Sequence, residues 1–301
     1  MSHIRISHIA KRYGEIEALR DASLEVEAGE IFGLIGPDGA GKTTLMRILC
    51  ALLAPDKGSA SICNFDVVRQ ASEAKARVGY MPQRFSLYPD LSVAENIRFF
   101  ADLYQVQRRD FDSRLPELLE FSKLGPFVER RAGKLSGGMK QKLALCCTLI
   151  HTPEVLVLDE PTAGVDPVSR LEFWEILERF AGKGVAILVS TPYMDEALRC
   201  RRIALIHKGE ILAIESPQNI PTLFDATLLE VEGEQLFPVA EKCRALPSVK
   251  SVHLFGGRLH ITTDDATTCR KEVAAVTGLP PGRIRDTAPS IEDTFISLLN
   301  S

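Results

Sequence analysis

The chain has 301 residues, of which 45% are hydrophobic and 25% are charged. This composition is typical of one or two globular domains, and it excludes a disordered or fibrous protein. Thirty-six basic and forty acidic side chains give a formal net charge of −4, so we expect no large cationic surface and no nucleic acid among its partners. The N-terminal stretch lacks an apolar leader, and no apolar run approaches the ~20 residues that span a bilayer. We therefore expect a chain that is neither secreted nor membrane-spanning.

The seven cysteines are odd in number, have no paired CxxC spacing and fall mostly inside apolar periodic stretches. This pattern predicts a reduced, cytosolic protein without structural zinc. His253, His260 and Cys269 near the C-terminus match no zinc template either. We therefore expect no structural metal.

In chain order, strand-like runs alternate with longer helical patterns from residue 4 to about residue 216. The runs are residues 30–35, 155–158, 185–189 and 203–206. This βαβ alternation predicts an α/β domain with a parallel sheet. Between residues 90 and 150 the strand signal disappears, and Ser92 and Glu95 form a capping-box pattern that opens a helix. We interpret this stretch as an inserted helical subdomain.

The pattern changes after Pro217. Strand-like runs occupy residues 227–231, 251–255 and 258–262, and helical patterns occupy residues 239–246 and 266–276. The sequence therefore predicts a first domain of residues 1–217 and a small α+β accessory domain of residues 220–301.

Residues 36–43 read Gly-Pro-Asp-Gly-Ala-Gly-Lys-Thr and fit the G-x-x-x-x-G-K-[ST] pattern of a phosphate-binding loop, with a strand-like run before it and an amphipathic helical pattern after it. Glycines let backbone N–H groups converge on phosphate oxygens, Lys42 offers a charge to the β and γ phosphates, and Thr43 offers a ligand for Mg²⁺. The carboxylate of Asp38 would repel phosphates mildly. The expected nucleotide-binding residues are Gly36, Pro37, Asp38, Gly39, Ala40, Gly41, Lys42, Thr43 and Thr44.

A second apolar strand pattern, at residues 155–158, is followed by two carboxylates, Asp159 and Glu160. Acidic residues at the carboxyl end of such a strand face a crevice at the edge of the sheet. Phosphoryl transfer needs a carboxylate that holds Mg²⁺ and a base that aligns water. We assign the first role to Asp159 and the second to Glu160.

Residues 135–141, Leu-Ser-Gly-Gly-Met-Lys-Gln, open another helical pattern and resemble the signature motif of ABC ATPases. The resemblance extends, in the family's order and spacing, over about residues 3–216. Tyr13 is similar to the aromatic residue that stacks on adenine, Gln83 to the Q-loop glutamine, and residues 163–166 to the D-loop. The resemblance implies a P-loop NTPase cassette with a mixed sheet and a helical insertion.

The resemblance also implies a mechanism. It makes the protein an ATPase that uses ATP and Mg²⁺, with Glu160, Gln83 and Lys42 as catalytic residues and Thr43, Gln83 and Asp159 around the metal. Two cassettes, identical or different, meet head to tail. Ser136, Gly137 and Gly138, at a helix N-terminus, then contact the ATP of the opposing cassette.

One position departs from the family pattern. Family members commonly carry a histidine in the motif Ser-Thr-His-Tyr-Met-Asp-Glu-Ala, whereas residues 190–197 here place Pro192 in the position of that histidine. Loss of one preorganised donor at a transferring phosphate costs about 10²–10³-fold in rate. Two interpretations stay open: an asymmetric pair in which a different cassette supplies the competent site, or a site in which Glu160, Gln83 and ordered water suffice.

The resemblance to drug-resistance-type exporters implies a separate membrane permease of the ABC-2 type, which would recognise the cargo. The cassette would then be cytoplasmic and peripheral, on the inner face of the cytoplasmic membrane. Its candidate docking surface is residues 84–100, with apolar anchors at Phe85, Leu87, Tyr88, Phe99 and Phe100. The alternatives are a soluble ABC ATPase without a permease and a hydrolysis-impaired regulatory half of an asymmetric pair.

Overall fold

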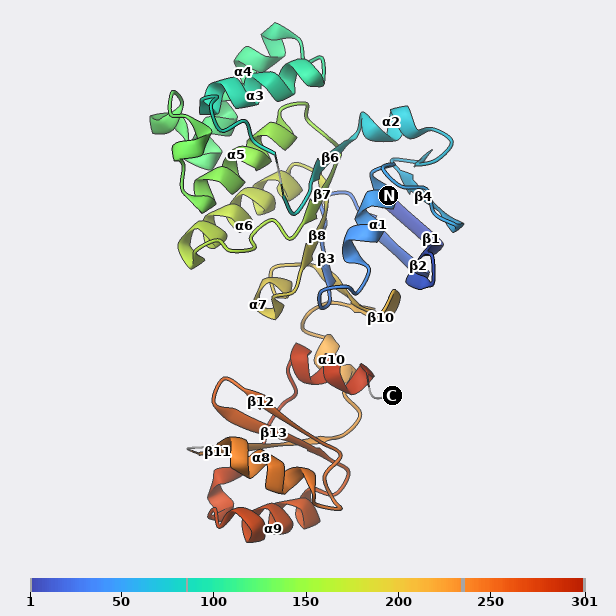
Figure 1. Ribbon diagram of the computed structural model, residues 1–301, viewed down its shortest axis with the longest axis vertical. Helices are drawn as coiled ribbons and strands as arrows, with labels where there is room; N and C mark the ends of the chain where they lie inside the picture. The colour runs from blue at the N-terminus through green and yellow to red at the C-terminus, as the bar shows by residue number, and fades with distance from the viewer. Residues whose placement is uncertain (1, 85, 234–235, 300–301) are drawn as a thin grey trace. The chain divides into compact units, whose positions relative to one another are not determined.

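A computed structural model describes residues 2–84, 86–233 and 236–299 of the chain (Figure 1). The predicted docking anchor Phe85 lies outside the described residues. The chain divides into two compact units, Met1–Pro217 and Gln218–Ser301. We describe each unit by itself.

The core of the first unit is a mostly parallel sheet with the strand order β10-β9-β3-β8-β7-β6. Its strands are β3 (Ile31–Ile35), β6 (Val78–Met81), β7 (Val155–Asp159), β8 (Ala186–Thr191), β9 (Arg202–His207) and β10 (Glu210–Glu215), of which only β10 pairs antiparallel, with β9. All residues of β3, β7 and β8 are buried, as expected for parallel strands that are covered on both faces. The predicted α/β class is confirmed.

A second, antiparallel sheet with the order β2-β1-β4-β5 completes this core. Its strands are β1 (Ser2–Tyr13), β2 (Ile16–Glu27), β4 (Lys57–Ile62) and β5 (Phe65–Asp66). The register of β1 against β2 shifts at several points, and these irregularities break the period-2 alternation that marks a strand in sequence. The alternation is nevertheless intact at residues 22–27 of β2, where every second residue is buried, so the signal for this sheet was present although the sheet was not predicted.

Helices cover both faces of the parallel sheet. In Figure 1, α5 and α6 lie on one side of it, and α1 with the antiparallel sheet lies on the other. The helices are α1 (Lys42–Leu49), α2 (Ala71–Lys75), α3 (Val93–Leu103), α4 (Arg108–Ser122), α5 (Gly137–Leu149), α6 (Pro167–Gly182) and α7 (Met194–Ala197), with 3-10 turns η1 (Gly125–Phe127) and η2 (Ala132–Lys134). The capping box predicted at the start of α3 is confirmed, because Ser92 and Glu95 exchange side-chain to backbone hydrogen bonds.

The second unit is a βαββαβ fold whose antiparallel sheet has the order β12-β13-β11-β14, the ferredoxin-like arrangement. Its elements are η3 (Ile220–Leu223), β11 (Thr227–Glu232), α8 (Leu236–Arg244), β12 (Ser251–Phe255), β13 (Arg258–Thr263), α9 (Ala266–Thr277), η4 (Pro281–Arg283), β14 (Ile284–Asp286) and α10 (Ile291–Leu299). Leu229, Val231, Leu259 and Ile261 join side chains of α8 and α9 in one apolar core.

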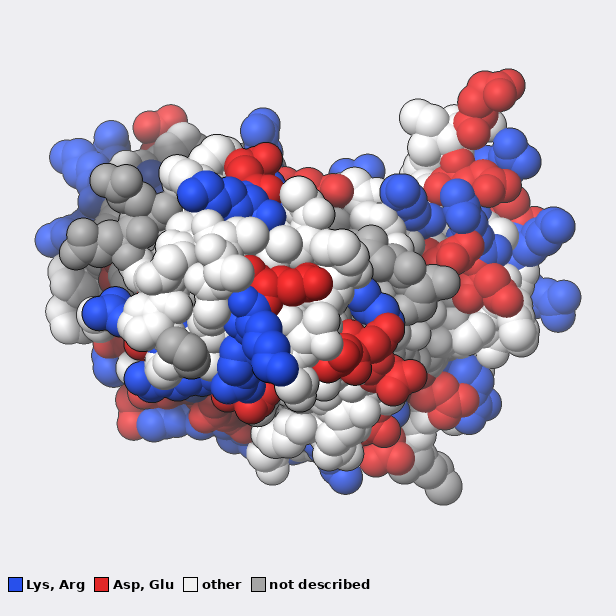
Figure 2. Space-filling view, turned by 90° about the horizontal axis from the view of Figure 1, so that it is seen from below, with Lys and Arg blue, Asp and Glu red and all other residues white. Residues whose placement is uncertain are grey.

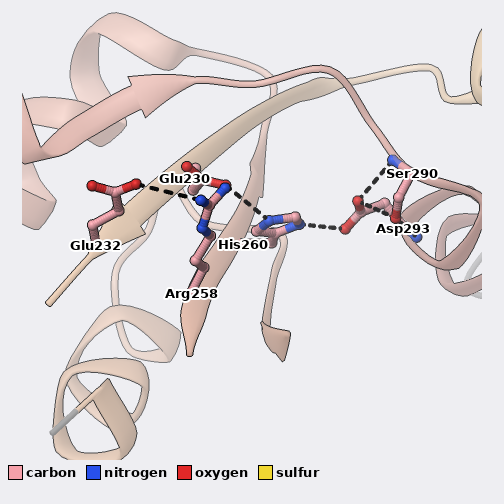
Figure 3. A network of polar contacts seen from close by, with 6 residues as sticks. All are labelled: Glu230, Glu232, Arg258, His260, Ser290 and Asp293. Atoms are coloured by element: carbon pink, nitrogen blue, oxygen red, sulfur yellow. Dashed lines mark hydrogen bonds and ion pairs between the residues drawn. The ribbon is translucent and has the colours of Figure 1, made fainter. Parts of the chain in front are cut away.

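The other face of this sheet carries a network of polar side chains (Figure 3). Nδ1 of His260 on β13 lies 2.8 Å from Oδ1 of Asp293 on α10, and Nε2 lies 3.6 Å from Glu230 on β11. Arg258 donates to the same Glu230 oxygen at 2.9 Å. The second oxygen of Asp293 accepts hydrogen bonds from the backbone N–H and the hydroxyl of Ser290, the residue before α10. The network therefore attaches α10 to the polar face of the sheet.

Among the described residues, none of the helices is long and apolar enough to cross a bilayer. On the face shown in Figure 2, basic and acidic side chains are interspersed.

Candidate nucleotide-binding site

The phosphate loop connects β3 to α1 and is held tightly against neighbouring backbone. A Cβ on Gly36 would lie 2.2 Å from the carbonyl oxygen of Ile206 in β9, and one on Gly41 would lie 2.5 Å from that of Ala18 in β2. Gly41 also has a φ of 107°, which favours glycine. It caps α1 without a side-chain hydrogen bond, so the first N–H groups of α1 are available to an anion.

The loop borders a cavity of about 380 Å³. The lining comprises Ile16, Glu17, Ala18, Asp38, Gly39, Ala40, Gly41, Lys42, Thr43, Thr44, Gln83 and Glu160. The structure thus brings residues 38–44 together with Gln83 and Glu160, which are distant in sequence. The contribution of β2 was missed by the sequence analysis because the antiparallel sheet was not predicted.

Three of the predicted residues are in direct contact at this cavity. The ammonium group of Lys42 lies 3.2 Å from one oxygen of Glu160, and the amide of Gln83 donates to the other oxygen at 2.9 Å. Lys42 also donates to the carbonyl oxygens of Gly36 and Pro37, at 2.7 and 3.0 Å. The side chains of Lys42 and Glu160 are only 3% and 10% exposed, so this ion pair is poorly screened by solvent.

At the carboxyl end of β7 the backbone is strained, and one buried carboxylate oxygen has no hydrogen-bond partner. Glu160 has a φ of 48°, a left-handed conformation that costs a non-glycine residue roughly 1–3 kcal/mol and is found mainly at functional sites. Its backbone N–H donates to the hydroxyl oxygen of Ser190 at 3.0 Å. The Ser190 hydroxyl in turn donates to Oδ1 of Asp159 at 2.7 Å, whereas Oδ2 of Asp159 is buried without a hydrogen-bond partner.

Unpaired buried oxygens are rare, and one in the residue that precedes Glu160 fits a Mg²⁺ ion, which prefers oxygen ligands, although Asp159 itself is outside the cavity lining. The positioning hydroxyl of Ser190 was missed by the sequence analysis. The available signal was its position: Ser190 directly follows the apolar strand-like run 185–189, just as Asp159 directly follows the run 155–158.

Two other predicted groups are outside the lining of this cavity. Ser136 caps α5 by accepting a hydrogen bond from the N–H of Met139 at 3.3 Å, and it is exposed together with Gly137. Gly138 is buried, and a Cβ there would lie 2.3 Å from the hydroxyl of Ser169 in α6. Tyr13, at the end of β1, is 46% exposed. Neither group belongs to the cavity lining.

The segment after β8, where Pro192 occupies the position of the family histidine, is tied to α6. The guanidinium group of Arg170 stacks over the ring of Tyr193 at 4.7 Å and pairs with Asp195 at 3.3 Å. Glu196, which is 2% exposed, accepts a hydrogen bond from Thr162 at 2.5 Å. This network links the segment to the turn that follows Glu160, and the sequence analysis missed it because its members lie on three separate elements.

Fold and site together define a nucleotide-binding protein of the P-loop class. The family profile described as "ABC transporter" matches residues 19–163. The chain is 42% identical to the probable multidrug ABC transporter ATP-binding protein YbhF of Escherichia coli (strain K12), a match that covers 98% of this chain and 52% of YbhF. It is 36% identical to the Nod factor export ATP-binding protein I of Burkholderia pseudomallei (strain K96243), over 98% of this chain and 96% of the relative. The chain thus spans about half the length of YbhF.

Solved structures agree. An ATP-binding subunit of an ABC transporter matches with a TM-score of 0.67 and 28% identity, covering 73% of this chain and 92% of the other. A dimeric structure of a bacterial ABC transporter cassette matches with a TM-score of 0.64 and 26% identity, covering 71% and 98%. The chain belongs to the ABC transporter family.

Proposed function

We propose that the chain is the ATP-binding and ATP-hydrolysing subunit of an ABC exporter and drives a separate membrane permease. The observation that carries this proposal is the contact of Lys42, Gln83 and Glu160 at the loop cavity, together with the unpaired buried oxygen of Asp159, the residue before Glu160. The names of the multidrug and Nod factor export relatives support export as the process. The subunit would be cytoplasmic and peripheral, on the inner face of the cytoplasmic membrane.

We assign nucleotide binding to residues 36–44, with Tyr13 against adenine. Lys42 already bonds to Glu160, so a phosphate oxygen that becomes the partner of Lys42 would release the carboxylate of Glu160. Glu160, still held by Gln83, can then accept a proton from water and align it for attack on the γ phosphate. Phosphate binding itself would thus activate the base.

We assign the Mg²⁺ site to Thr43, Gln83 and Asp159. The free Oδ2 of Asp159 supports this assignment. When bound, Mg²⁺ neutralises charge on the phosphates. Ser190 fixes the other oxygen of Asp159 and the backbone of Glu160 at once, so it positions the metal ligand and the base relative to each other.

We propose that the chain works as one of a pair of cassettes. The exposed Ser136 and Gly137, followed by the buried Gly138 at the start of α5, supply N–H groups that would bind the ATP of the opposing cassette. Their absence from the lining of this chain's own cavity supports a role toward a second cassette, identical or different. One of the related solved structures is a cassette dimer.

We propose that the permease, of the ABC-2 type, docks beside residues 84–100. A second cavity, of about 410 Å³, has Gln83, Arg84 and Leu87 in its lining, together with residues of α5. The predicted anchors Tyr88 and Phe99 are 44% and 38% exposed, and their rings lie 4.5 Å apart. Gln83 lines both cavities. A permease segment bound in the second cavity would therefore change the hydrogen bond from Gln83 to Glu160 in the first.

The test is ATP turnover of the purified full chain with Mg²⁺, beside the variant Glu160→Gln and the exposed-residue control Glu178→Gln. We expect turnover in the chain and in the control, and a loss of about 10²–10⁴-fold in Glu160→Gln with ATP binding retained. Equal turnover in all three proteins would overturn the catalytic assignment. Co-purification with a permease from membranes tests the exporter role separately.

The replacement of the family histidine by Pro192 favours a second candidate function. In it, this chain is the hydrolysis-impaired cassette of a pair whose other cassette is different and competent. Pro192 has no side-chain donor, and Arg170 holds the segment that follows it. The variant Pro192→His distinguishes the two candidates. If it raises turnover by about 10²-fold or more, the natural chain depends on another cassette. If turnover is unchanged, the chain's own residues replace the histidine.

A further inference from the structure

A cluster of three metal-ligating side chains lies outside the nucleotide site, in the first unit. In the part of the chain that the structure describes, His3 on β1, Cys63 in the turn after β4 and Glu154 before β7 place one ligand atom each within 4.8 Å of one another. Their positions in the sequence differ by 60 and 91 residues, so no spacing pattern announces them. The sequence analysis, which judged metal sites by spacing, expected no structural metal.

The backbone holds two of these ligands in place. The N–H of Cys63 donates to the carbonyl oxygen of His3 at 2.8 Å, and the N–H of Glu154 donates to that of Arg77 at 2.9 Å. Arg77 also pairs with the carboxylate of Glu154 at 3.2 Å and stacks on the ring of Phe65. A carboxylate that ligates a metal is commonly oriented by such an outer hydrogen-bonding partner.

The imidazole of His3 provides a second, independent observation. Its Nδ1 atom is buried and has no hydrogen-bond partner. A buried ring nitrogen without a partner costs roughly 1–3 kcal/mol, and a metal ion would satisfy it. His3 and Glu154 also line a cavity of about 340 Å³, which gives an ion a path to both ligands.

We propose that His3, Cys63 and Glu154 form a binding site for a divalent transition-metal ion of the zinc type. Imidazole nitrogen, thiolate sulfur and carboxylate oxygen are the ligands that Zn²⁺ takes, with water or another ligand in the fourth position. Burial and the neighbouring carboxylate of Glu154 raise the pKa of the Cys63 thiol to about 11, so binding replaces the thiol proton, which passes to solvent.

The position of this site excludes it from ATP hydrolysis. Glu154 precedes β7, whereas Asp159 ends it, and five residues of extended strand separate their Cα atoms by about 16 Å. A metal ion at the amino end of β7 would connect the antiparallel sheet, through His3 and Cys63, to the parallel sheet. Its role is therefore to stabilise the first unit.

The test is titration of the nucleotide-free full chain with Co²⁺, a spectroscopic substitute for Zn²⁺. We expect one equivalent to produce a thiolate-to-cobalt charge-transfer band that Cys63→Ser abolishes. His3→Gln and Glu154→Gln should each weaken Co²⁺ binding by at least ~10-fold. The matched control is His8→Gln, because His8 lies on the same strand but is exposed and pairs with Asp21. Its binding should equal that of the unmodified chain.

A second measurement needs no variant. Zn²⁺ should slow the alkylation of Cys63, as followed by peptide mass spectrometry, because Cys63 is partly exposed whereas the other cysteines among the described residues are buried. The absence of a charge-transfer band, its persistence in Cys63→Ser, or unchanged alkylation with Zn²⁺ would each overturn the site. If Co²⁺ affinity is unchanged in both His3→Gln and Glu154→Gln, the ion binds adventitiously to the thiol alone. That result would also overturn the proposed three-ligand site.

Discussion

The two units each contain a cluster of charged side chains, and the clusters differ in how fully their polar atoms are paired. In the first unit, Glu160 lines the loop cavity and has a strained backbone, and the preceding residue Asp159, which is outside the lining, keeps an unpaired buried oxygen. On the polar sheet face of the second unit, His260 bonds to Asp293, and both oxygens of Asp293 accept hydrogen bonds. Strained groups are found mainly at functional sites and a buried oxygen without a partner is available to a ligand, whereas both oxygens of Asp293 are already occupied by contacts within the fold.

This comparison predicts that the first cluster controls nucleotide binding and the second controls stability alone. The largest effect is expected for Lys42→Ala. It removes the charge that would contact phosphate and leaves the buried Glu160 without its ion-pair partner. We expect ATP affinity to fall by about 2–5 kcal/mol, measured by equilibrium binding. His260→Gln is the control, and a comparable loss of ATP affinity in that variant would break the comparison.

The next effect is expected for His260→Gln itself, measured as stability. The substitution removes a hydrogen bond between charged groups whose side chains are only 12% and 3% exposed. We expect it to destabilise the second unit by about 1.5–3 kcal/mol, detected as faster amide exchange in α10. Exchange in α1 of the first unit should not change. Unchanged protection of α10 would show that the network does not hold this helix.

Gly138→Ala tests whether one signature glycine also has a structural role. Its Cβ would lie 2.3 Å from the Ser169 hydroxyl, whereas the Cβ of the matched variant Gly137→Ala has nothing within 4 Å. We expect a loss of about 1–3 kcal/mol in the unfolding free energy for Gly138→Ala and at most about 0.5 kcal/mol for Gly137→Ala. Equal denaturant midpoints for the two variants would contradict this packing argument.

The smallest effect is a pH dependence of the second unit. The hydrogen bond to Asp293 raises the pKa of His260 against the opposing effect of burial. Burial raises the pKa of Asp293, but bonds from His260 and Ser290 outweigh it and hold that pKa below its usual range.

A raised histidine pKa stabilises the fold fully below the unfolded value of about 6.5, and this contribution is lost as pH rises through the folded value. Protection of α10 should therefore decrease as pH rises above about 6.5, through the raised pKa of His260. His260→Gln should remove that slope relative to the unmodified chain. A slope of the same size in both proteins would assign the pH dependence to other groups.

Local patterns were sufficient to predict much of the fold. The phosphate loop, the capping box at Ser92 and the apolar strands that became β3, β7 and β8 depend on neighbouring residues, and the structure contains each of them. The helix predicted at residues 239–246 is α8, Leu236–Arg244, an offset of two or three residues. Helix α10 was missed although Ser290 and Asp293 exchange hydrogen bonds in a capping-box pattern that the sequence displays.

By itself, the sequence determined the family and predicted a phosphate loop at residues 36–44, because the pattern of such a loop is read from consecutive residues of the chain. The tertiary structure decided everything that depends on contacts between distant segments. Lys42 meets Glu160 only because β3 and β7 end at the same edge of one parallel sheet, with β8 between them. His3, Cys63 and Glu154 meet only because the ends of separate strands converge, and no spacing in a chain encodes such convergence.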